Sequence, residues 1–380
     1  MKFIKIIIAI LVVGGGIWLI AGWNQQTKVP SSEPFKLGFI GPLTSDAAVY
    51  GIDEQNAVTL AVEEINQSGG ISGRRIEVIY EDGKCTGKDA ATAAQKLINI
   101  DKVKIILGGI CSSETLAMAP ITEQNKVLVF SALSSSPEIT KAGDYVFRNS
   151  PSDLDVAKGY ADYIFKKAGY KNIAVLSENT DYGMGVRQVF SEAFKNLGGM
   201  IVADEVFRQG ERDFRVQLAK IKSANPQAVF INPQAGITGG LVLKQLKELG
   251  VTTPIFSVFV FSGEDARVAA GGSAEGLVFF DVVGLTTEKG KEFRDKFISR
   301  FSKIGGSDYD VGARYDSVYI LADAMKKCSE DTDCLKRYLY NLDWYDGVIG
   351  RYKFDENGDV VGINPLTPKT IRGGRVELLR

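Results

Sequence analysis

From residue 35 onward, short apolar runs rich in β-branched residues alternate with segments whose apolar residues recur at helical spacing. The first strand-like runs are residues 35–43, 75–80, 103–108 and 127–130. The helical segments between them are residues 57–65, 88–100 and one that starts at 114. Strands that alternate with helices in this way predict a parallel sheet covered by helices on both faces, complete by about residue 150.

The same alternation begins again after residue 150. Its strand-like runs are residues 172–177, 200–207, 254–258 and 277–283, and two helices are expected between 288 and 327. The order helix, Gly-Gly, strand occurs at Gly69 and Gly70 and again at Gly198 and Gly199, which is a weak internal repeat. A chain of 380 residues is also longer than one core usually spans. We therefore expect two α/β lobes, each with a Rossmann-like parallel sheet.

The N-terminus has the pattern of an export signal. Lys2 and Lys5 precede an uncharged apolar run over residues 6–23, and the first acid is Glu33. Such a run fits a signal peptide, and it is also close to the roughly 20 residues that span a bilayer. No A-x-A cleavage site follows it, which favours a retained membrane anchor. Both alternatives place the rest of the chain outside the cytoplasm, in the periplasm or on the outer face of the cell membrane, after a linker over residues 24–34.

Composition excludes several classes of function. The chain is 45% hydrophobic and 24% charged, as globular proteins are, and its net charge is −1 without a Lys/Arg block of the kind nucleic-acid binders carry. It has no histidine, which rules out Ser-His-Asp and Cys-His catalysis and removes the commonest metal ligand. The glycines at 69–73 follow a helix and precede a strand, the reverse of a dinucleotide-binding loop. We expect no enzyme activity, cofactor, metal site or nucleic-acid partner.

The four cysteines all follow the linker, and an even number in an oxidising compartment predicts disulfides. Four cysteines allow three pairings. The short spacing between Cys328 and Cys334 favours their pairing, which leaves Cys85 with Cys111.

Three loops follow strands and enter helices, where ligands of open α/β sheets bind. They are residues 108–113, 134–137 and 179–183. Their hydroxyl and N–H groups suit a carboxylate, although serine at a helix start is often only a cap. Ser136 with Pro137 has the pattern of such a cap. Tyr50 and Tyr182 flank glycines, and they either wall an apolar ligand or cover the core.

Several stretches together resemble the leucine/isoleucine/valine-binding type of periplasmic binding protein, the receptor of branched-chain amino-acid ABC transporters. The stretches are IGPLTSDAAVYG, GGISGRRIEVIYEDGKC, GGICSSETLA, SSSPEIT, NTDYGMG and IGRYKFDENGD. The resemblance covers residues 35–380. It implies the type I periplasmic binding fold, with two lobes joined by a hinge of three crossovers, and a disulfide between Cys85 and Cys111.

The resemblance also implies a ligand site. Ser112, with Ser113 beside it, is similar to the family's serine for the ligand carboxylate. The hydroxyl of Ser135 and the carbonyl of Leu133 correspond to groups that bind the α-ammonium. Tyr182 corresponds to a second-lobe tyrosine, and Tyr50 to an aromatic residue at the mouth of the cleft.

The chain departs from the family at two positions. A further second-lobe tyrosine falls at Ala235 or Gly236, and the glutamate that pairs with the ammonium falls at about Phe259. An unpaired buried ammonium is costly. Either another acid supplies the charge or the ligand has no ammonium there. The candidate acids are Glu264, Asp265 and Asp281. The aromatic residues Phe256, Phe259 and Phe261 either enlarge the pocket or form the inner face of a strand.

The chain is thus expected to be a monomeric extracytoplasmic receptor of an ABC transporter. It would capture an amino acid or related carboxylate-bearing solute by hinge closure and deliver it to a membrane permease. Lobe 1 is expected over residues 35–150 plus about 281–354, and lobe 2 over residues 151–280 plus about 355–380. An extracellular sensor of the same fold is the alternative, and an adhesion or structural protein without a ligand is a third class.

Overall fold

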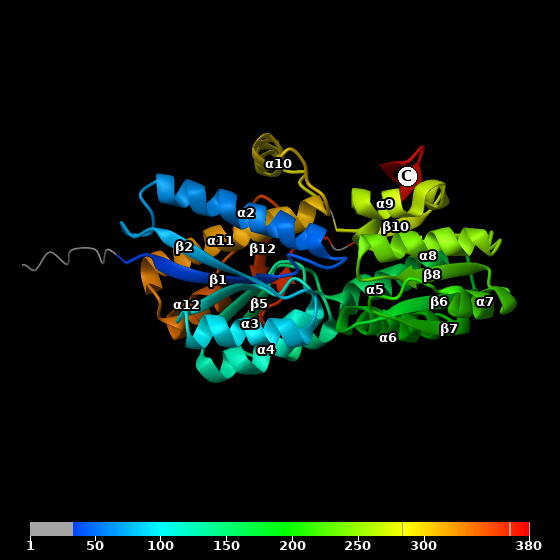
Figure 1. The fold of residues 1–380 in the computed structure, drawn as a ribbon, viewed down its shortest axis with the longest axis horizontal. Coiled ribbons are helices and arrows are strands. Elements are labelled where there is room, and N and C mark those ends of the chain that lie inside the picture. The colour runs from blue at the N-terminus through cyan, green and yellow to red at the C-terminus, as the bar shows by residue number, and fades with distance from the viewer. Residues whose placement is uncertain (1–32, 283, 365, 380) are drawn as a thin grey trace, which may run out of the picture.

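The computed structural model describes residues 33–282, 284–364 and 366–379. The expected signal peptide or anchor, and most of the linker, lie outside the described residues. Two α/β bodies lie side by side along the long axis of the molecule (Figure 1). Within the described residues, no helix combines the length and apolar character needed to cross a membrane.

The first body is built around a parallel five-stranded sheet in the order β2-β1-β3-β4-β5. Its strands are β1 (Phe35–Gly41), β2 (Ile76–Asp82), β3 (Ile105–Gly108), β4 (Leu128–Ser131) and β5 (Val146–Arg148). Strands β3 and β4 are buried at every position, as expected for a sheet covered on both faces. The helices of this first half of the chain are α2 (Ala48–Gln67), α3 (Gly87–Asn99) and α4 (Ser112–Asn125).

Three later helices complete the first body. They are α10 (Glu288–Phe301), α11 (Asp308–Cys328) and α12 (Thr332–Tyr340). Helix α11 packs along α2, and α12 contacts β4. A small antiparallel sheet of β11 (Tyr345–Gly347), β12 (Gly350–Phe354) and β13 (Val360–Val361) joins the same body. It does so through the ring of Phe354, whose centroid lies 5.5 Å from that of Phe130 and 5.7 Å from that of Phe147.

The second body contains a seven-stranded sheet in the order β15-β14-β10-β9-β8-β6-β7. Its strands are β6 (Asn172–Asn179), β7 (Met200–Arg208), β8 (Ala228–Asn232), β9 (Ile255–Ser257), β10 (Val278–Asp281), β14 (Thr367–Arg372) and β15 (Arg375–Leu378). Strand β14 pairs antiparallel with both of its neighbours, β10 and β15, and the other strand pairs of this sheet are parallel. The helices are α5 (Asp153–Asp162), α6 (Asp181–Asn196), α7 (Arg215–Ser223), α8 (Gly236–Glu248) and α9 (Glu264–Ala270). The remaining elements are short helices of other types. Three are 3-10 helices: η1 (Pro137–Lys141), η3 (Phe259–Ser262) and η4 (Gly271–Ala274). The fourth, η2 (Tyr163–Lys167), is a π-helix.

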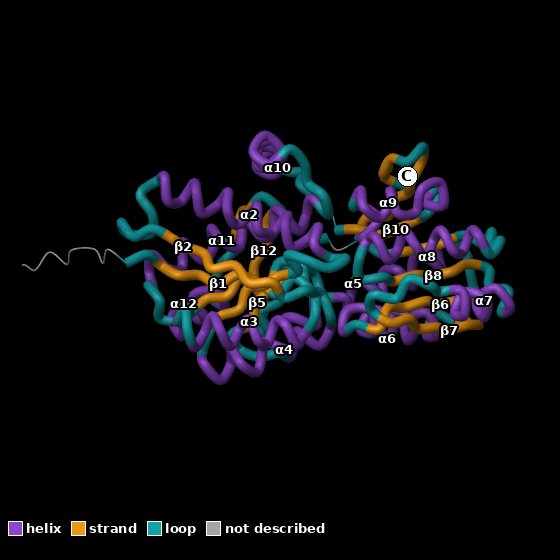
Figure 2. The backbone as a smooth tube through the Cα atoms, viewed as in Figure 1, coloured by secondary structure: helices purple, strands orange, loops and turns teal. Residues whose placement is uncertain are grey.

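The chain passes between the two bodies after β5, after β10 and after β13. Figure 2 shows the strands of each body in its interior, with helices on the outside. The predicted fold class, two parallel-sheet lobes joined by a hinge of three crossovers, is confirmed. Strand β10, which ends at Asp281, pairs with β9 and β14 of the second body, and β13 still pairs with β12 of the first. The chain therefore leaves the first body after residue 361 rather than at about 354.

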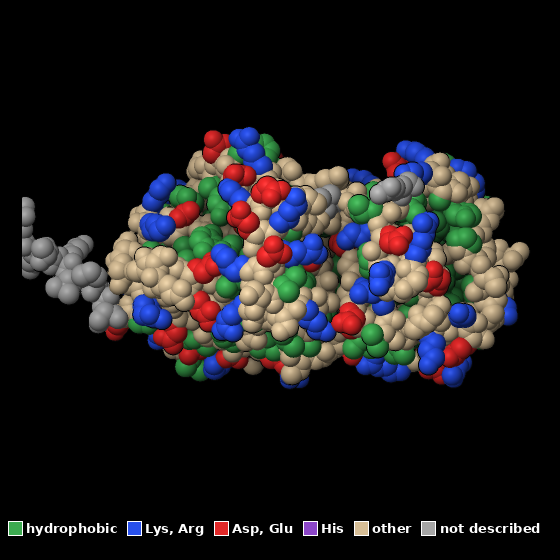
Figure 3. Space-filling view, turned by 90° about the horizontal axis from the view of Figure 1, so that it is seen from above, with side chains coloured by type: hydrophobic (Ala, Val, Ile, Leu, Met, Phe, Trp, Pro, Cys, Tyr) green, Lys and Arg blue, Asp and Glu red, His purple; other side chains and the backbone are tan. Residues whose placement is uncertain are grey.

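Both predicted disulfides are confirmed. Cys85 is bonded to Cys111 and Cys328 to Cys334, with Cα atoms 5.3 and 5.5 Å apart. The first links the loop after β2 to the start of α4, and the second links α11 to α12. On the face seen in Figure 3, acidic and basic side chains are interspersed, and neither sign gathers into a large patch.

Candidate ligand site between the two bodies

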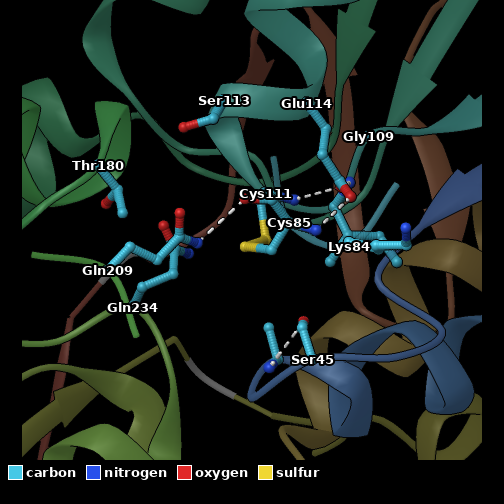
Figure 4. The surroundings of a disulfide bond; sticks show 12 residues. Ser45, Lys84, Cys85, Gly109, Cys111, Ser113, Glu114, Thr180, Gln209 and Gln234 are labelled. Atoms are coloured by element: carbon cyan, nitrogen blue, oxygen red, sulfur yellow. Dashed lines mark hydrogen bonds between the residues drawn. A yellow bond between two sulfur atoms is a disulfide. The ribbon is translucent and has the colours of Figure 1, made fainter. Parts of the chain in front are cut away.

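The turn between β3 and α4 is held by one buried carboxylate. Glu114 Oε2 accepts the N–H groups of Ile110 and Cys111 at 2.9 and 3.0 Å, and Oε1 accepts that of Cys85 at 2.9 Å. Burial raises the pKa of Glu114 to about 7, against the lowering effect of these donors. The carboxylate thus holds the backbone at both cysteines of the Cys85–Cys111 disulfide (Figure 4). It thereby also fixes the position of Ser112, which directly follows Cys111.

Glycine is required at the start of this turn. Gly108 has φ +144°, and a Cβ there would lie 2.1 Å from the carbonyl oxygen of Ile40. A Cβ on Gly109 would lie 2.5 Å from Cβ of Glu114. No larger side chain fits at either position. The two glycines therefore let the backbone of this turn lie close to Ile40 of β1 and Glu114 of α4.

We expect Glu114→Gln to weaken both stability and ligand affinity. The amide keeps one acceptor oxygen, so at least one buried N–H loses its partner, at a cost of about 1–3 kcal/mol. The shift in the urea midpoint measures the stability change, and calorimetry measures ligand affinity. The matched control is Glu138→Gln, an exposed glutamate in η1. Equal midpoints and affinities for the two variants would show that the Glu114 contacts are dispensable.

The serine loop after β4 lies against this turn. Ser112 is the first residue of α4, is 1% exposed, and its Oγ accepts the N–H of Ser136 at 3.2 Å. The hydroxyl of Ser135 donates to Asp153 Oδ2 at 2.8 Å. The Leu133 carbonyl accepts the hydroxyl of Ser150 at 3.2 Å. The two loops predicted from the sequence are therefore neighbours, as parallel strand ends must be.

The helix start expected at Ser136 and Pro137 is confirmed: the 3-10 helix η1 begins at Pro137, with Ser136 in the N-cap position. The Ser136 side chain makes no capping hydrogen bond, and its buried Oγ has no hydrogen-bond partner among the described residues. Asp153, which the sequence did not single out, is fully buried beside Ser135, and burial raises its pKa to about 7.

Three aromatic rings from different elements meet between the bodies. Tyr50 comes from α2, Tyr182 from α6 and Phe259 from η3. The Phe259 centroid lies 5.8 Å from that of Tyr50 and 6.1 Å from that of Tyr182. Both tyrosines are 3% exposed, and neither hydroxyl has a hydrogen-bond partner within the part of the chain that the structure describes. The apolar pattern of the sequence allowed Phe259 to lie on the inner face of a strand. It does not, because the chain turns into η3 after β9.

Polar contacts also link the bodies. Ser113 Oγ accepts the N–H of Asp181 at 3.4 Å, and the side-chain amide of Gln209 donates to the Cys85 carbonyl at 3.1 Å (Figure 4). Arg212 of the second body pairs with Asp46 of the first at 2.7 Å. A cavity of about 370 Å³ lies beside these contacts and is lined from both bodies. Its lining includes Ser45, Lys84, Cys85, Glu178, Gln209 and Gln234.

The candidate acids for a ligand ammonium occupy different environments. Glu264 is paired with Lys303 at 2.9 Å, and both side chains are largely exposed. Asp281 is paired with Lys369 at 2.6 Å and accepts the hydroxyl of Ser262 at 2.5 Å. Both carboxylate oxygens of Asp265 are buried and have no hydrogen-bond partner in residues 33–282, 284–364 and 366–379. Two of the three acids already have a cation partner within the protein.

A fourth acid was missed by sequence reasoning. Asp310, in the first turn of α11, is 5% exposed, and no described residue hydrogen-bonds to its Oδ2. Burial and the neighbouring charges of Asp281, Glu54 and Asp53 raise its pKa well above the usual range. Acidic residues in the first turn of a helix are common for electrostatic reasons, so the sequence carried no signal for it.

A sequence profile described as "Periplasmic binding protein" matches residues 34–372. The chain is 27% identical over 346 residues to a leucine-, isoleucine-, valine-, threonine- and alanine-binding protein of Pseudomonas aeruginosa, covering 90% of each. The structure superposes on the isoleucine complex of a branched-chain amino-acid transporter substrate-binding protein from Streptococcus pneumoniae. The TM-score is 0.82 at 29% identity, with 91% of this chain and 98% of the other covered.

A second solved structure has a different ligand. It is a solute-binding protein of an ABC transporter from Rhodopseudomonas palustris in complex with 3,4-dihydroxybenzoic acid. Its TM-score is 0.79 at 26% identity, and the match covers 90% of this chain and 95% of that one. With the profile covering nearly the whole described chain, and with two bodies that meet around a buried aromatic and polar site, this chain belongs to the periplasmic binding protein family.

Proposed function

We propose that the chain is the extracytoplasmic solute receptor of an ABC transporter and that it binds a small carboxylate-bearing solute between its two bodies. The observation that carries the proposal is the meeting of Tyr50, Tyr182 and Phe259 next to the two serine loops. These residues come from both bodies, and several of their buried polar groups lack partners. Buried polar groups are normally hydrogen-bonded, so a ligand is the natural partner.

The carboxylate is the shared chemistry of the ligands named for the two solved relatives, isoleucine and 3,4-dihydroxybenzoic acid. In this chain it would bind at the start of α4, where a 14-residue helix presents its N-terminus. The Ser112 hydroxyl lies there, and the unpartnered Ser136 hydroxyl is beside it. Ser135 and Leu133 would bind the neighbouring part of the ligand.

Capture would proceed by hinge closure about the three connections. The contacts Arg212–Asp46 and Gln209–Cys85 join the two bodies, and we propose that they form on closing. The loaded receptor would then deliver its ligand to a membrane permease, acting as a monomer and without chemistry of its own. The lobes of this hinge are the first body, residues 35–148 with 288–361, and the second body, residues 153–281 with 367–378.

A thermal-shift screen of amino acids, aromatic acids and their amides tests the proposal. A ligand at 100 times its dissociation constant stabilises the folded state by about 2.7 kcal/mol, which raises the melting temperature measurably. We expect at least one carboxylate to do so and its amide to fail. If no carboxylate raises the melting temperature, or if amides act equally well, the proposed ligand class is wrong.

A further inference from the structure

The start of α11 is held at the junction of the two bodies. The Tyr309 hydroxyl donates to the Asn149 carbonyl at 2.5 Å, and the Asn149 side-chain amide donates to the Ala313 carbonyl at 2.7 Å. Asn149 directly follows β5, where the chain first passes to the second body. Asp310 lies between the two α11 residues that make these contacts, so its position at the junction is fixed from both sides.

The cations near Asp310 are already engaged. Arg314, one turn further along α11, pairs with Glu54 at 2.6 Å. Lys369 pairs with Asp281 at 2.6 Å. Asp53, a neighbouring acid, accepts the N–H groups of the adjacent glycines 305 and 306, each at 2.8 Å, and has no ion pair among the described residues. The acidic side chains in this region therefore outnumber the cations that are free to pair with them. These acids are buried, and an unpaired carboxylate is costly in a buried environment.

The unpartnered hydroxyls of the aromatic rings provide a second, independent observation. The hydroxyls of Tyr50 and Tyr182 are buried without hydrogen-bond partners among the described residues. Burial raises the pKa of each, and the charges that add to this include Asp265 and Asp310 for Tyr50 and Asp153 and Asp310 for Tyr182. Tyr50 also contacts the loop that leads into α11, because a Cβ on Gly306 would lie 2.8 Å from its ring. A free carboxylate oxygen and two free phenol oxygens thus belong to one buried region.

We infer that Asp310 binds a positively charged ammonium group of the ligand, between the rings of Tyr50 and Tyr182. A carboxylate and aromatic ring faces together make a favourable environment for a cation, and the phenol oxygens can accept its remaining N–H groups. Asp310 would then supply the charge that the chain lacks at Phe259. The inference rests on the proposed function, and it narrows the ligand class to solutes that carry both a carboxylate and an ammonium.

Two pairs of probes that differ in one charge test this inference. L-isoleucine is compared with 3-methylpentanoate, and 4-(aminomethyl)benzoate with 4-methylbenzoate, each titrated by calorimetry. We expect the wild-type protein to prefer the ammonium-bearing member of a pair by at least about tenfold, since a charged hydrogen bond contributes about 1.5–3 kcal/mol. Asp310→Asn should reduce this preference about tenfold or more without weakening binding of the probe that lacks the ammonium.

Two further variants separate charge recognition from damage to the fold. Asp310→Glu keeps the charge and should retain most of the preference, whereas Glu264→Gln removes an exposed acid and should leave it unchanged. An unaltered preference in Asp310→Asn, or a wild-type protein that favours the probes without an ammonium, would overturn the inference while leaving the carboxylate receptor standing. Failure of all four probes to bind, together with a negative thermal-shift screen, would instead overturn the proposed function.

Discussion

Ser112→Asp is expected to weaken binding of a carboxylate ligand about a thousandfold. Two like charges about 4 Å apart near a protein surface repel by about 4 kcal/mol, and each 1.4 kcal/mol corresponds to a factor of ten. The substitution also removes the hydroxyl that accepts the Ser136 N–H. Binding should become undetectable for a ligand of micromolar affinity, as calorimetry of the purified variant would show.

The fold should tolerate this change. Ser112 is the first residue of α4, and an aspartate in the first turn of a helix interacts favourably with the helix dipole. The neutral variant Ser112→Asn is the matched control, because it has the same shape without the charge. If aspartate and asparagine reduce affinity equally, repulsion is not the cause, and the ligand carboxylate does not lie at Ser112.

Arg314→Met is expected to cost about 3–5 kcal/mol of stability, because it leaves Glu54 as an unpaired buried charge. Both side chains of this ion pair are fully buried, with Nε and Oε2 2.6 Å apart. The guanidinium also donates to the Phe130 carbonyl at 2.8 Å, so it joins α11, α2 and β4. The pair therefore holds the late helices of the chain on the first body.

A double substitution tests the origin of this loss. Replacing both members by apolar residues, Glu54→Leu with Arg314→Met, removes the unpaired charge and should recover much of the stability. Urea unfolding followed by circular dichroism compares the variants. If the double variant is no more stable than Arg314→Met, the loss of stability comes from packing rather than from the charge left on Glu54.

The parallel sheets were predictable because their strands are runs of β-branched and aliphatic residues buried on both faces. The runs that became β1, β3, β4 and β6 were found to within a few residues. Strands β5 and β8, the third sheet and strands β14 and β15 were not found. Strands β5 and β8 are short and buried at every position. The others are short and partly exposed, with polar residues among the apolar ones, and such strands are stabilised by pairing rather than by a local pattern.

The candidate site was predictable only in part. The loops that contain Ser112, Ser135 and Tyr182 follow strands, so the alternation of elements indicated where they would lie. The contact of Phe259 with Tyr50 and Tyr182 joins three elements far apart in the chain, and no local periodicity encodes it. Asp310 was missed for the same reason, since its burial depends on the packing of α11 at the junction rather than on its neighbours in sequence.

Small-angle X-ray scattering with and without a ligand from the screen tests the central claim, closure of two bodies on a small solute. We expect the radius of gyration of the free protein, produced without residues 1–32, to exceed the value calculated from the described residues of this structure, and ligand to reduce it to that value. The Ser112→Asp variant should remain at the larger value. A protein that binds its ligand while its radius of gyration stays constant would contradict the account.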